Sequence, residues 1–514
     1  MSRLRAVLVG LCLAASATQS FFFAWALAPD SEEEMYMYLG KLALTGHISL
    51  FQDDLTGNRM PLPYYVLGLS QLVWPRSLLA ARFVSASLGL ICLVLVWRIA
   101  SRLAGEVAGI LALLFGVTHG LLIGYFDIAL YHSLVSVLIL GALYLDLCTE
   151  WRARRLAAMA LISLLFFTRT LIAPLIPGAL VYFLWHARDL RERLVLVAIT
   201  VLPPTVFFAT DPNHWKLLAY VPVLDRLAAS RGFVSNRGAA FATVNVLVAE
   251  GPMTAVRLFA RWYRMWLLAG VGVVVAAVIA GRPVSRLFGN RGVNVVAAAA
   301  IYLAACQVLI MGRWKLPLAV GYFPSFAILG AICLGCWLAS VLEGLERMPR
   351  LRTLALAGLC VFFLAAPALS RPLMLPLSVS WQDPPVTAFY GMASELGRAV
   401  PPGSKVFNLG GAGLYTAGLD PYVRQERGFD GLVTESEDPR LAKSGLWGTR
   451  DIKEWLGRDA AYAVIAPSRV AFYRGTRLDP ALDLIDSLLA SHFTLISVID
   501  RYPGSIYYVY RRIR

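Results

Sequence analysis

The residues best suited to chemistry form a cluster of acids directly after the first apolar segment. Asp30, Glu32, Glu33 and Glu34 lie within five residues of one another, and no basic residue follows until Lys41. Adjacent carboxylates repel one another and hold protons more tightly, which suits a group that must take a proton from a reacting hydroxyl. An acidic first turn of a helix would explain the same four residues without any chemistry.

A second polar group follows later in the same segment. Asp53 and Asp54 form another acidic pair. Residues 58–65 then read Asn-Arg-Met-Pro-Leu-Pro-Tyr-Tyr, a turn that includes Arg59. Its two prolines favour an extended backbone, and its tyrosines suit the headgroup zone of a membrane. The pattern indicates polar residues held at a bilayer surface.

Three further cations stand where the sequence predicts the outer membrane surface. Arg169 lies in an apolar segment, fourteen residues after Arg155. A helix would carry it about 21 Å through the bilayer, and a charge within a span is usually functional. Arg313 and Lys315 lie in a short outer connection, where basic residues are disfavoured and require an anionic partner. A snorkelling arginine or ordinary loop charge is the structural alternative.

The elements that must position these residues are membrane helices. Of 514 residues, 58% are hydrophobic and 15% charged, against about 45–50% and about 25% in soluble proteins. The composition excludes a cytosolic enzyme, a disordered chain and a small disulfide scaffold. The net charge of +15 would favour nucleic acid in a soluble protein. Here its placement reports membrane topology, and no nucleic-acid partner is expected.

The apolar segments predict a polytopic α-helical membrane protein with about eleven spans. The first, residues 6–28, is longer than a signal-peptide core, and we interpret it as a retained spanning helix. Each of the others has about the 20 residues that a bilayer requires. They are centred on Leu90, Leu114, Leu138, Leu164, Leu180, Leu202, Val273, Ala300, Leu329 and Phe362.

The arginines predict the orientation of these spans. With the N-terminus in the cytoplasm, six alternate connections each carry two or three arginines, as the positive-inside rule requires. A multi-pass protein of the plasma (inner) membrane is therefore expected. The segments 29–75, 211–261 and 370–514 then lie outside. We expect a transmembrane domain over residues 1–370, with 29–75 as its functional outer loop, and an extracytoplasmic domain over 371–514.

The C-terminal stretch changes composition and contains about 17 basic and 15 acidic residues. Apolar strand candidates at 405–408 and 462–466 alternate with helix candidates at 387–400 and 480–491. This order predicts a small α/β domain. The segment 410–413, Gly-Gly-Ala-Gly, follows a strand but lacks the rest of a nucleotide-binding fingerprint, so we interpret it as a loop.

Other motifs favour structure over chemistry. Cys333 and Cys336 have CxxC spacing but lie in an apolar helix, where packing is the expected role. Asp127 and His132 flank a tight outer turn, where capping or helix pairing is expected. The histidines lack ligand spacing, and no zinc site is predicted.

Together, these outer-loop residues resemble a known family. The spanning helix, acidic pair, Tyr36–Lys41 segment, Gly46, Pro-Leu-x-Tyr-Tyr turn and Ala81-Arg82 occur in the order of the first outer loop of GT-C glycosyltransferases. The resembling branch contains the protein mannosyltransferases and the aminoarabinose transferase of lipid A. The resemblance implies a GT-C fold, and the helix pattern and the outer C-terminal domain extend it over most of the chain.

The resemblance assigns roles to the acids. It places Glu32 and Glu33 on the family's Asp-Glu pair, so Glu32 takes the position of the catalytic base, as Glu in place of Asp. Asp30 takes this role if the loop shifts. The family's second acid falls on Asn58, a departure for which Asp53 or Asp54 would have to substitute.

The resemblance also assigns the cations to a lipid phosphate. Arg59 occupies the position of a family lysine, and Arg169 lies where the family has another. Arg313 and Lys315 lie in a basic element of the family. All four are expected to bind the phosphate of a polyprenyl-phosphate sugar donor.

These parts permit a single inverting displacement. The departing phosphate is an anion and needs cations more than a general acid, whereas the acceptor hydroxyl needs a base. The acceptor would be an extracytoplasmic glycan, lipid or protein hydroxyl, with membrane lipids around the spans. No metal is required, although the acids would accept Mg²⁺ or Mn²⁺.

The competing interpretation is a transporter or flippase of lipid-linked sugars. Such proteins often have two similar halves and mid-membrane charges, whereas here the unusual charges gather outside. Separate replacement of Glu32, Asp30 and Arg169 distinguishes the two classes, because a transporter has no sugar transfer to lose.

Overall fold

The computed structural model describes residues 3–29, 31–51, 60–169, 172–220, 225–233, 263–279, 287–314, 324–369, 385–433, 440–502 and 505–513, with four further positions between 253 and 260. The chain forms two compact units. Unit 1 comprises residues 1–24, 85–204 and 249–379, and unit 2 comprises 25–84, 205–248 and 380–514. The first outer loop thus packs with the C-terminal part. The predicted extracytoplasmic domain 371–514 stays a prediction.

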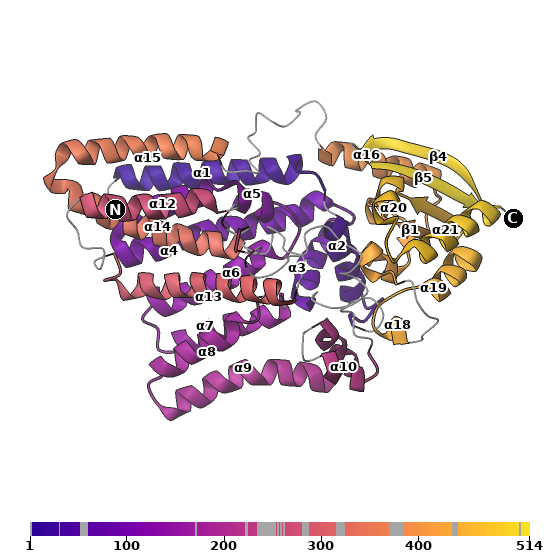
Figure 1. Cartoon of the computed structure of the whole chain (residues 1–514), viewed down its shortest axis with the longest axis horizontal. Helices are drawn as coiled ribbons and strands as arrows, with labels where there is room; N and C mark the ends of the chain where they lie inside the picture. Colours follow the sequence, from indigo (N-terminus) through magenta and orange to yellow (C-terminus); the bar gives the residue numbers. More distant parts are fainter. Residues whose placement is uncertain are drawn as a thin grey trace. The chain divides into compact units, whose positions relative to one another are not determined.

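Unit 1 is built from apolar helices (Figure 1). They are α1 (Arg3–Ala26), α4 (Leu78–Val117, which begins in unit 2), α5 (Gly120–Phe126), α6 (His132–Cys148), α7 (Arg154–Ser163), the 3₁₀ turn η1 (Leu164–Phe167), α8 (Leu175–His186), α9 (Leu190–Thr210), α12 (Arg264–Ile279), α13 (Arg291–Trp314), α14 (Pro324–Gly344), η5 (Leu345–Arg347) and α15 (Pro349–Leu369).

Every predicted span centre lies within one of these helical segments, so the helical membrane fold is confirmed. In the described part of the chain, five helices are long and apolar enough to cross a membrane. They are Arg5–Ala26, Leu78–Val117, Leu190–Thr210, Arg291–Val308 and Pro324–Arg347. Three shorter apolar helices accompany them. The number of eleven spans stays a prediction.

Helix α4 contains two arms that fold back on each other. Its backbone leaves the helical region at Ala104 (φ −141°, ψ 25°) and Gly105 (φ 83°, ψ 170°). A Cβ on Gly109 would lie 2.9 Å from the carbonyl oxygen of Trp97, in the first arm. The two arms therefore pack closely, which explains why a single 40-residue segment holds two predicted span centres.

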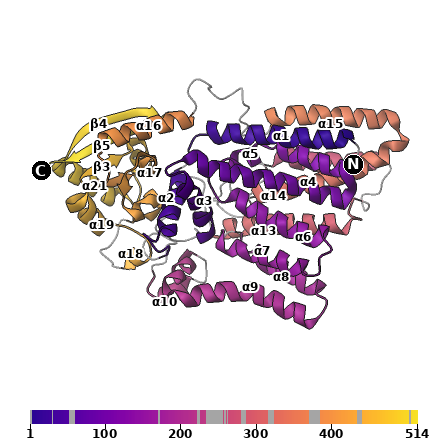
Figure 2. The same ribbon diagram turned by 180° about the vertical axis from the view of Figure 1, so that it is seen from behind.

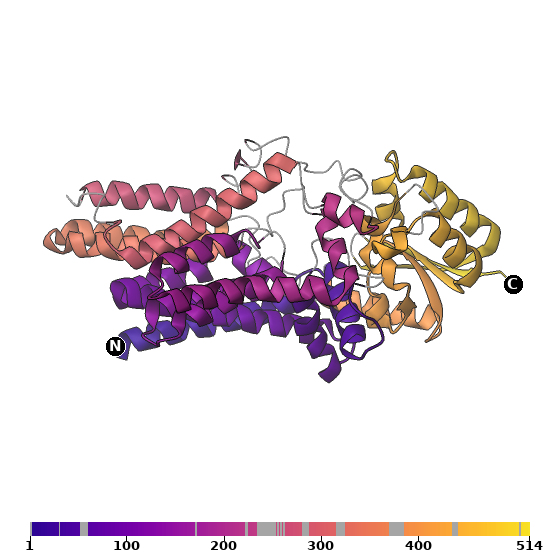
Figure 3. The same ribbon diagram turned by 90° about the horizontal axis from the view of Figure 1, so that it is seen from below.

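Helix α14 is the most enclosed of the long apolar helices, and 78% of its most apolar window is buried. Helices α12 and α13 both lie against it (Figure 3). A Cβ on Gly335 would lie 2.7 Å from the carbonyl oxygen of Ala108, so glycine lets α14 approach α4. Cys333 and Cys336 are buried in this helix, as the packing interpretation predicted.

Unit 2 combines two outer-loop helices with the C-terminal α/β part. The loop helices are α2 (Ser31–Leu44) and α3 (Pro61–Val73), accompanied by η2 (Pro212–Tyr220) and α10 (Asp225–Ser230). The C-terminal helices are α16 (Pro385–Ala399), α17 (Leu414–Ala417), η7 (Val423–Gly431), α18 (Arg440–Lys443), α19 (Thr449–Glu454), η8 (Trp455–Asp459), α20 (Pro467–Tyr473) and α21 (Asp479–His492).

The C-terminal part contains a five-stranded sheet of order β2-β1-β3-β5-β4 (Figure 2). Strands β2 (Asp420–Pro421) and β3 (Tyr462–Ile465) run parallel to β1 (Lys405–Leu409). Strands β4 (Phe493–Tyr502) and β5 (Ser505–Arg512) form an antiparallel pair that joins β3 through β5. The predicted strands at 405–408 and 462–466 and helices at 387–400 and 480–491 correspond to β1, β3, α16 and α21, so the α/β prediction is confirmed.

Close backbone contact holds α2 against α3. A Cβ on Gly40 would lie within 3 Å of the carbonyl group of Tyr64, and a Cβ on Gly68 would lie equally close to the backbone of Gly40. The rings of Tyr36 and Tyr64 pack with centroids 4.7 Å apart. These tyrosines and glycines of the first loop therefore form the contact between α2 and α3.

Reporter fusions test the predicted orientation. Alkaline phosphatase fused to the intact C-terminus should be active, because this enzyme folds only outside the cytoplasm, where its disulfides form. A fusion after Arg347 should be inactive, since the positive-inside rule places this arginine-rich connection in the cytoplasm. An inactive C-terminal fusion alongside an active Arg347 fusion would reverse the topology.

Candidate functional site

Glu32, Glu33 and Glu34 of the acidic cluster lie in the first turn of α2, which begins at Ser31. Successive residues of a helix point about 100° apart, so Glu32, Glu33 and Glu34 face three different surroundings. This separation is the main feature of the site, because the three adjacent carboxylates make contacts with three different parts of the protein.

Glu33 forms a fully buried ion pair with Arg82. Nε of Arg82 donates to Oε1 of Glu33 at 2.8 Å and Nη2 donates to Oε2 at 2.7 Å, and neither side chain is exposed. Arg82 Nη1 also donates to the carbonyl oxygen of Leu27 at 2.7 Å. The pair therefore fixes α2 to the start of α4 and to the segment before α2. Glu33, which the resemblance places in the family's acidic pair, is thus held in an ion pair, and its predicted catalytic role stays a prediction.

Glu34 fastens α2 to the C-terminal part of unit 2. Its carboxylate accepts hydrogen bonds from the Thr416 backbone N–H at 3.0 Å, from the Thr416 hydroxyl at 2.6 Å and from the Gly413 N–H. Burial raises the pKa of Glu34 above its ordinary value, and these hydrogen bonds oppose the rise. One turn further along α2, the Tyr38 hydroxyl donates to Asp420 Oδ1 at 2.8 Å. Two successive turns of α2 are thus bonded to the C-terminal part.

Glu32 lies on a pocket of about 130 Å³ within unit 2. The residue is partly exposed. The pocket is polar on several sides, and its wall combines the first turn of α2 with loops at the ends of the strands. Its lining residues are Glu32, Glu34, Met35, Asn408, Gly410, Gly411, Ala412, Leu414, Gln425, Glu426, Gly428, Phe429, Arg469 and Tyr473.

Two neighbouring residues of η7 bring polar groups to this pocket. Gln425 is 1% exposed, and its Oε1 accepts from the Asn408 N–H at 3.0 Å, whereas its Nε2 has no hydrogen-bond partner in the described part of the chain. Burial, followed by the negative charges of Glu34 and Asp420, raises the pKa of Glu426 to about 8. The pocket therefore offers a donor and a carboxyl that holds its proton near neutral pH.

Sequence reasoning missed Gln425, Glu426 and Arg469. They belong to η7 and α20 and show no spacing that relates them to the acidic turn of α2. Only the fold brings them to one wall. The loop after β1, Gly410–Gly413, was correctly interpreted as a loop, and it proves to line the pocket.

Arg169 belongs to unit 1 and follows η1. It is 6% exposed, and its guanidinium carbon lies 4.3 Å from the ring centre of Tyr131, an arrangement typical of a cation–π contact. Asp127 is fully buried in the turn before α6, and His132 begins that helix. Arg169 is thus buried against an aromatic ring, and its predicted role as a phosphate-binding cation stays a prediction.

The remaining predicted site residues are not tested. Asp30, Asp53, Asp54, Arg59 and Lys315 lie outside the described residues, and Arg313 belongs to the last turn of α13. The predicted phosphate and second-acid roles therefore stay predictions. Within the described ranges, no group of three His, Cys, Asp or Glu side chains is placed to hold a metal ion.

The family comparison agrees with the resemblance of the first loop. Residues 58–208 match the family model of dolichyl-phosphate-mannose-protein mannosyltransferases. This segment of the chain is therefore similar to the dolichyl-phosphate-mannose-protein mannosyltransferases. The match covers less than a third of the chain. It begins at Asn58, just before Arg59, and reaches α9, so it includes Arg82 and Arg169 but not Glu32.

Solved structures resemble this chain at low identity. ArnT from Cupriavidus metallidurans bound to undecaprenyl phosphate has 12% identity and a TM-score of 0.45, over 98% of this chain and 97% of that one. AglB from Archaeoglobus fulgidus, in complex with an inhibitory peptide and a dolichol-phosphate, has 12% identity and a TM-score of 0.49, over 98% and 74%. The same organism's oligosaccharyltransferase in complex with Zn and sulfate has 12% identity and a TM-score of 0.46, over 97% and 72%. No curated protein matches the chain. At these TM-scores, none of the structures assigns a site or substrate here.

Breaking the Glu33–Arg82 pair tests its structural role. Arg82→Gln should lower the free energy of unfolding by about 3–5 kcal/mol, because it leaves a buried carboxylate without its partner. Thermal melting of the detergent-solubilised protein measures the loss. The double variant Glu33→Gln/Arg82→Gln should melt higher than Arg82→Gln alone. Arg98→Gln, at an exposed position of the same helix, is the control, and an equal effect there would contradict the assignment.

The raised pKa of Glu426 predicts a pH-dependent stability. Between its ordinary value of 4.5 and about 8, the folded protein keeps a proton that the unfolded chain releases, so this residue makes stability fall as pH rises. Glu426→Gln removes that dependence. Its melting temperature relative to the original protein should therefore be higher at pH 8 than at pH 5. A difference that does not vary with pH would contradict the raised pKa.

Proposed function

We propose that this chain is an integral-membrane, inverting glycosyltransferase that moves a sugar from a polyprenyl-phosphate donor to an extracytoplasmic hydroxyl of a glycan, lipid or protein. The observation that carries the proposal is the division of tasks in the acidic turn. Glu33 is committed to Arg82 and Glu34 to the Gly413–Thr416 segment, whereas Glu32 lines the pocket.

Glu32 would act as the general base. A sugar hydroxyl or a serine-type hydroxyl is a poor nucleophile until its proton is removed as it attacks. In our proposal the acceptor oxygen attacks the anomeric carbon, its proton passes to the Glu32 carboxylate, and the bond to the donor phosphate breaks with both electrons on the phosphate oxygen. One displacement inverts the anomeric centre, and no step passes through a metal.

Cations would stabilise the departing polyprenyl phosphate. Arg169 is the described candidate, because it is buried at the end of η1 and belongs to the segment that matches the mannosyltransferase family. Arg59, Arg313 and Lys315 complete the proposed set. Guanidinium groups bind phosphate oxygens through two parallel hydrogen bonds, and their charge lowers the barrier as negative charge develops.

The C-terminal residues of the pocket would contact the acceptor. The Gln425 amide can donate a hydrogen bond, and Glu426 carries a carboxyl whose raised pKa keeps it largely protonated at neutral pH. Both are suited to orient a hydroxylated acceptor beside Glu32. In this proposal the extracytoplasmic segment 371–514 selects the acceptor, and the acidic loop performs the proton transfer.

The proposal is tested with the full-length protein in nanodiscs. Polyprenyl-phosphate hexoses and pentoses serve as donors, and released polyprenyl phosphate is measured. Glu32→Gln should lower turnover by about 10²–10⁴-fold, as expected for loss of a general base, with donor binding unchanged. Arg169→Gln should weaken donor binding instead. The donor that supports turnover identifies the sugar class.

Glu346→Gln, at an exposed position in the η5 turn, is the matched control and should keep full turnover. Unchanged turnover in Glu32→Gln would exclude Glu32 as the base. Binding of every donor without release of polyprenyl phosphate would favour a transporter over a transferase.

A further inference from the structure

An apolar groove of about 470 Å³ lies in unit 1, whereas the acidic turn belongs to unit 2. Helices α8 and α13 form its two long sides, and α6 and α7 contribute to its floor. Small residues make the space: Gly178 and Ala179 on α8 face Ala298 and Ala299 on α13. The small side chains in the sequences of α8 and α13 therefore produce the groove.

The two long sides are tied together at both ends. At one end the Tyr302 hydroxyl donates to the carbonyl oxygen of Pro174 at 3.0 Å. At the other end Arg291 donates to Nε2 of His186. Tyr302 follows Arg291 by eleven positions of α13, a rise of about 16 Å. This length matches one leaflet, half of the hydrocarbon thickness of about 30 Å.

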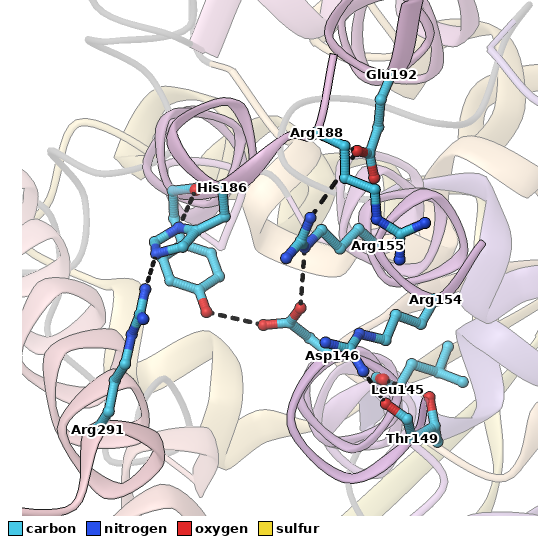
Figure 4. A network of polar contacts seen from close by, with 10 residues as sticks. Leu145, Asp146, Thr149, Arg154, Arg155, His186, Arg188, Glu192 and Arg291 are labelled. Carbon is cyan, nitrogen blue, oxygen red and sulfur yellow. Dashed lines mark hydrogen bonds and ion pairs between the residues drawn. The ribbon is translucent and has the colours of Figure 1, made fainter. Parts of the chain in front are cut away.

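One end of the groove is rich in arginine: Arg154, Arg155, Arg188 and Arg291 lie there together with the acids Asp146 and Glu192 (Figure 4). The guanidinium of Arg155 lies 3.9 Å from Asp146 and 3.9 Å from Glu192. Asp146 also accepts from the Tyr182 hydroxyl at 2.9 Å. The acids on this end are thus already engaged with Arg155.

Arg291 contacts an imidazole in place of an acid. Nδ1 of His186 lies 2.8 Å from the carbonyl oxygen of Tyr182, so Nδ1 carries the proton and Nε2 accepts from Arg291. This tautomer of His186 is neutral. Arg291 is exposed, forms no ion pair with a carboxylate in the described part of the chain, and begins α13. The helix dipole adds positive potential at that end.

We propose that this groove binds an anionic glycerophospholipid, with one acyl chain between α8 and α13 and the phosphate at Arg291. Charge complementarity selects an anionic headgroup, and the length of the groove selects a chain of one leaflet. The headgroup end of this site, at Arg291 and His186, adjoins Asp146 and Arg155 near the start of α7, whereas Arg169 follows the other end of that helix. It is therefore separate from the proposed donor phosphate site, and the lipid would hold α6, α8 and α13 together.

Native mass spectrometry of the full-length protein tests the proposal. The protein is delipidated and supplied with phosphatidylglycerol or phosphatidylcholine. Phosphatidylglycerol should be retained preferentially and should raise the melting temperature. Arg291→Gln should lower its retention by about fivefold, the value of one cation near an anionic headgroup. Ala298→Leu, at an exposed groove position, should exclude the chain and abolish the preference.

Arg193→Gln, an exposed arginine of α9 outside the groove, is the matched control and should retain the lipid. A photoactivatable phosphatidylglycerol should label peptides of α8 and α13 in the original protein. Three results would overturn the proposal. They are equal retention of the two lipids, a loss of phosphatidylglycerol in Arg193→Gln equal to that in Arg291→Gln, and isolation of a polyprenyl phosphate crosslinked in the groove. None of these readouts depends on sugar transfer, so the lipid site and the proposed function can fail separately.

Discussion

The buried ion pair between Glu33 and Arg82 is the interaction on which the arrangement of unit 2 depends. Two unexposed charges in contact are stable only together, because either one alone would lack both solvent and a counter-ion. Their contact sets the rotation of α2 about its own axis. Once Glu33 faces Arg82, the helical repeat directs Glu34 and Glu32 elsewhere. Glu34 then reaches Thr416, and Glu32 lines the pocket.

This arrangement joins segments that are far apart in the chain. Glu34 and Thr416 are 382 positions apart, and Tyr38 and Asp420 are also 382 apart. The pocket is consequently built by an outer-loop helix together with loops of the C-terminal sheet. In the proposed function, the base comes from one segment and the acceptor contacts from the other, so acceptor binding can be coupled to the placement of the base.

In unit 1, small residues determine how closely the helices pack, and arginines carry its main polar contacts. Glycines such as Gly109 and Gly335 allow close helix packing, as is common where helices associate in lipid. Between α8 and α13, small residues such as Gly178 and Ala298 leave a groove, which larger side chains such as Tyr182 and Tyr302 also line. The two arginines on either side of α7 and η1 also have different surroundings. Arg155 lies near two acids, whereas Arg169 lies over an aromatic ring.

Local sequence was sufficient for the helical membrane fold and for the α/β character of the C-terminal part. These properties follow from the partition of apolar segments into hydrocarbon and from short-range periodicity, so neighbouring residues contain the necessary information. Only the tertiary structure decided three further arrangements. They are the pairing of Glu33 with Arg82, the anchoring of Glu34 at Thr416, and the presence of Gln425 and Glu426 beside Glu32. Each depends on a partner tens or hundreds of residues away, and no local spacing records which of three adjacent carboxylates will meet it.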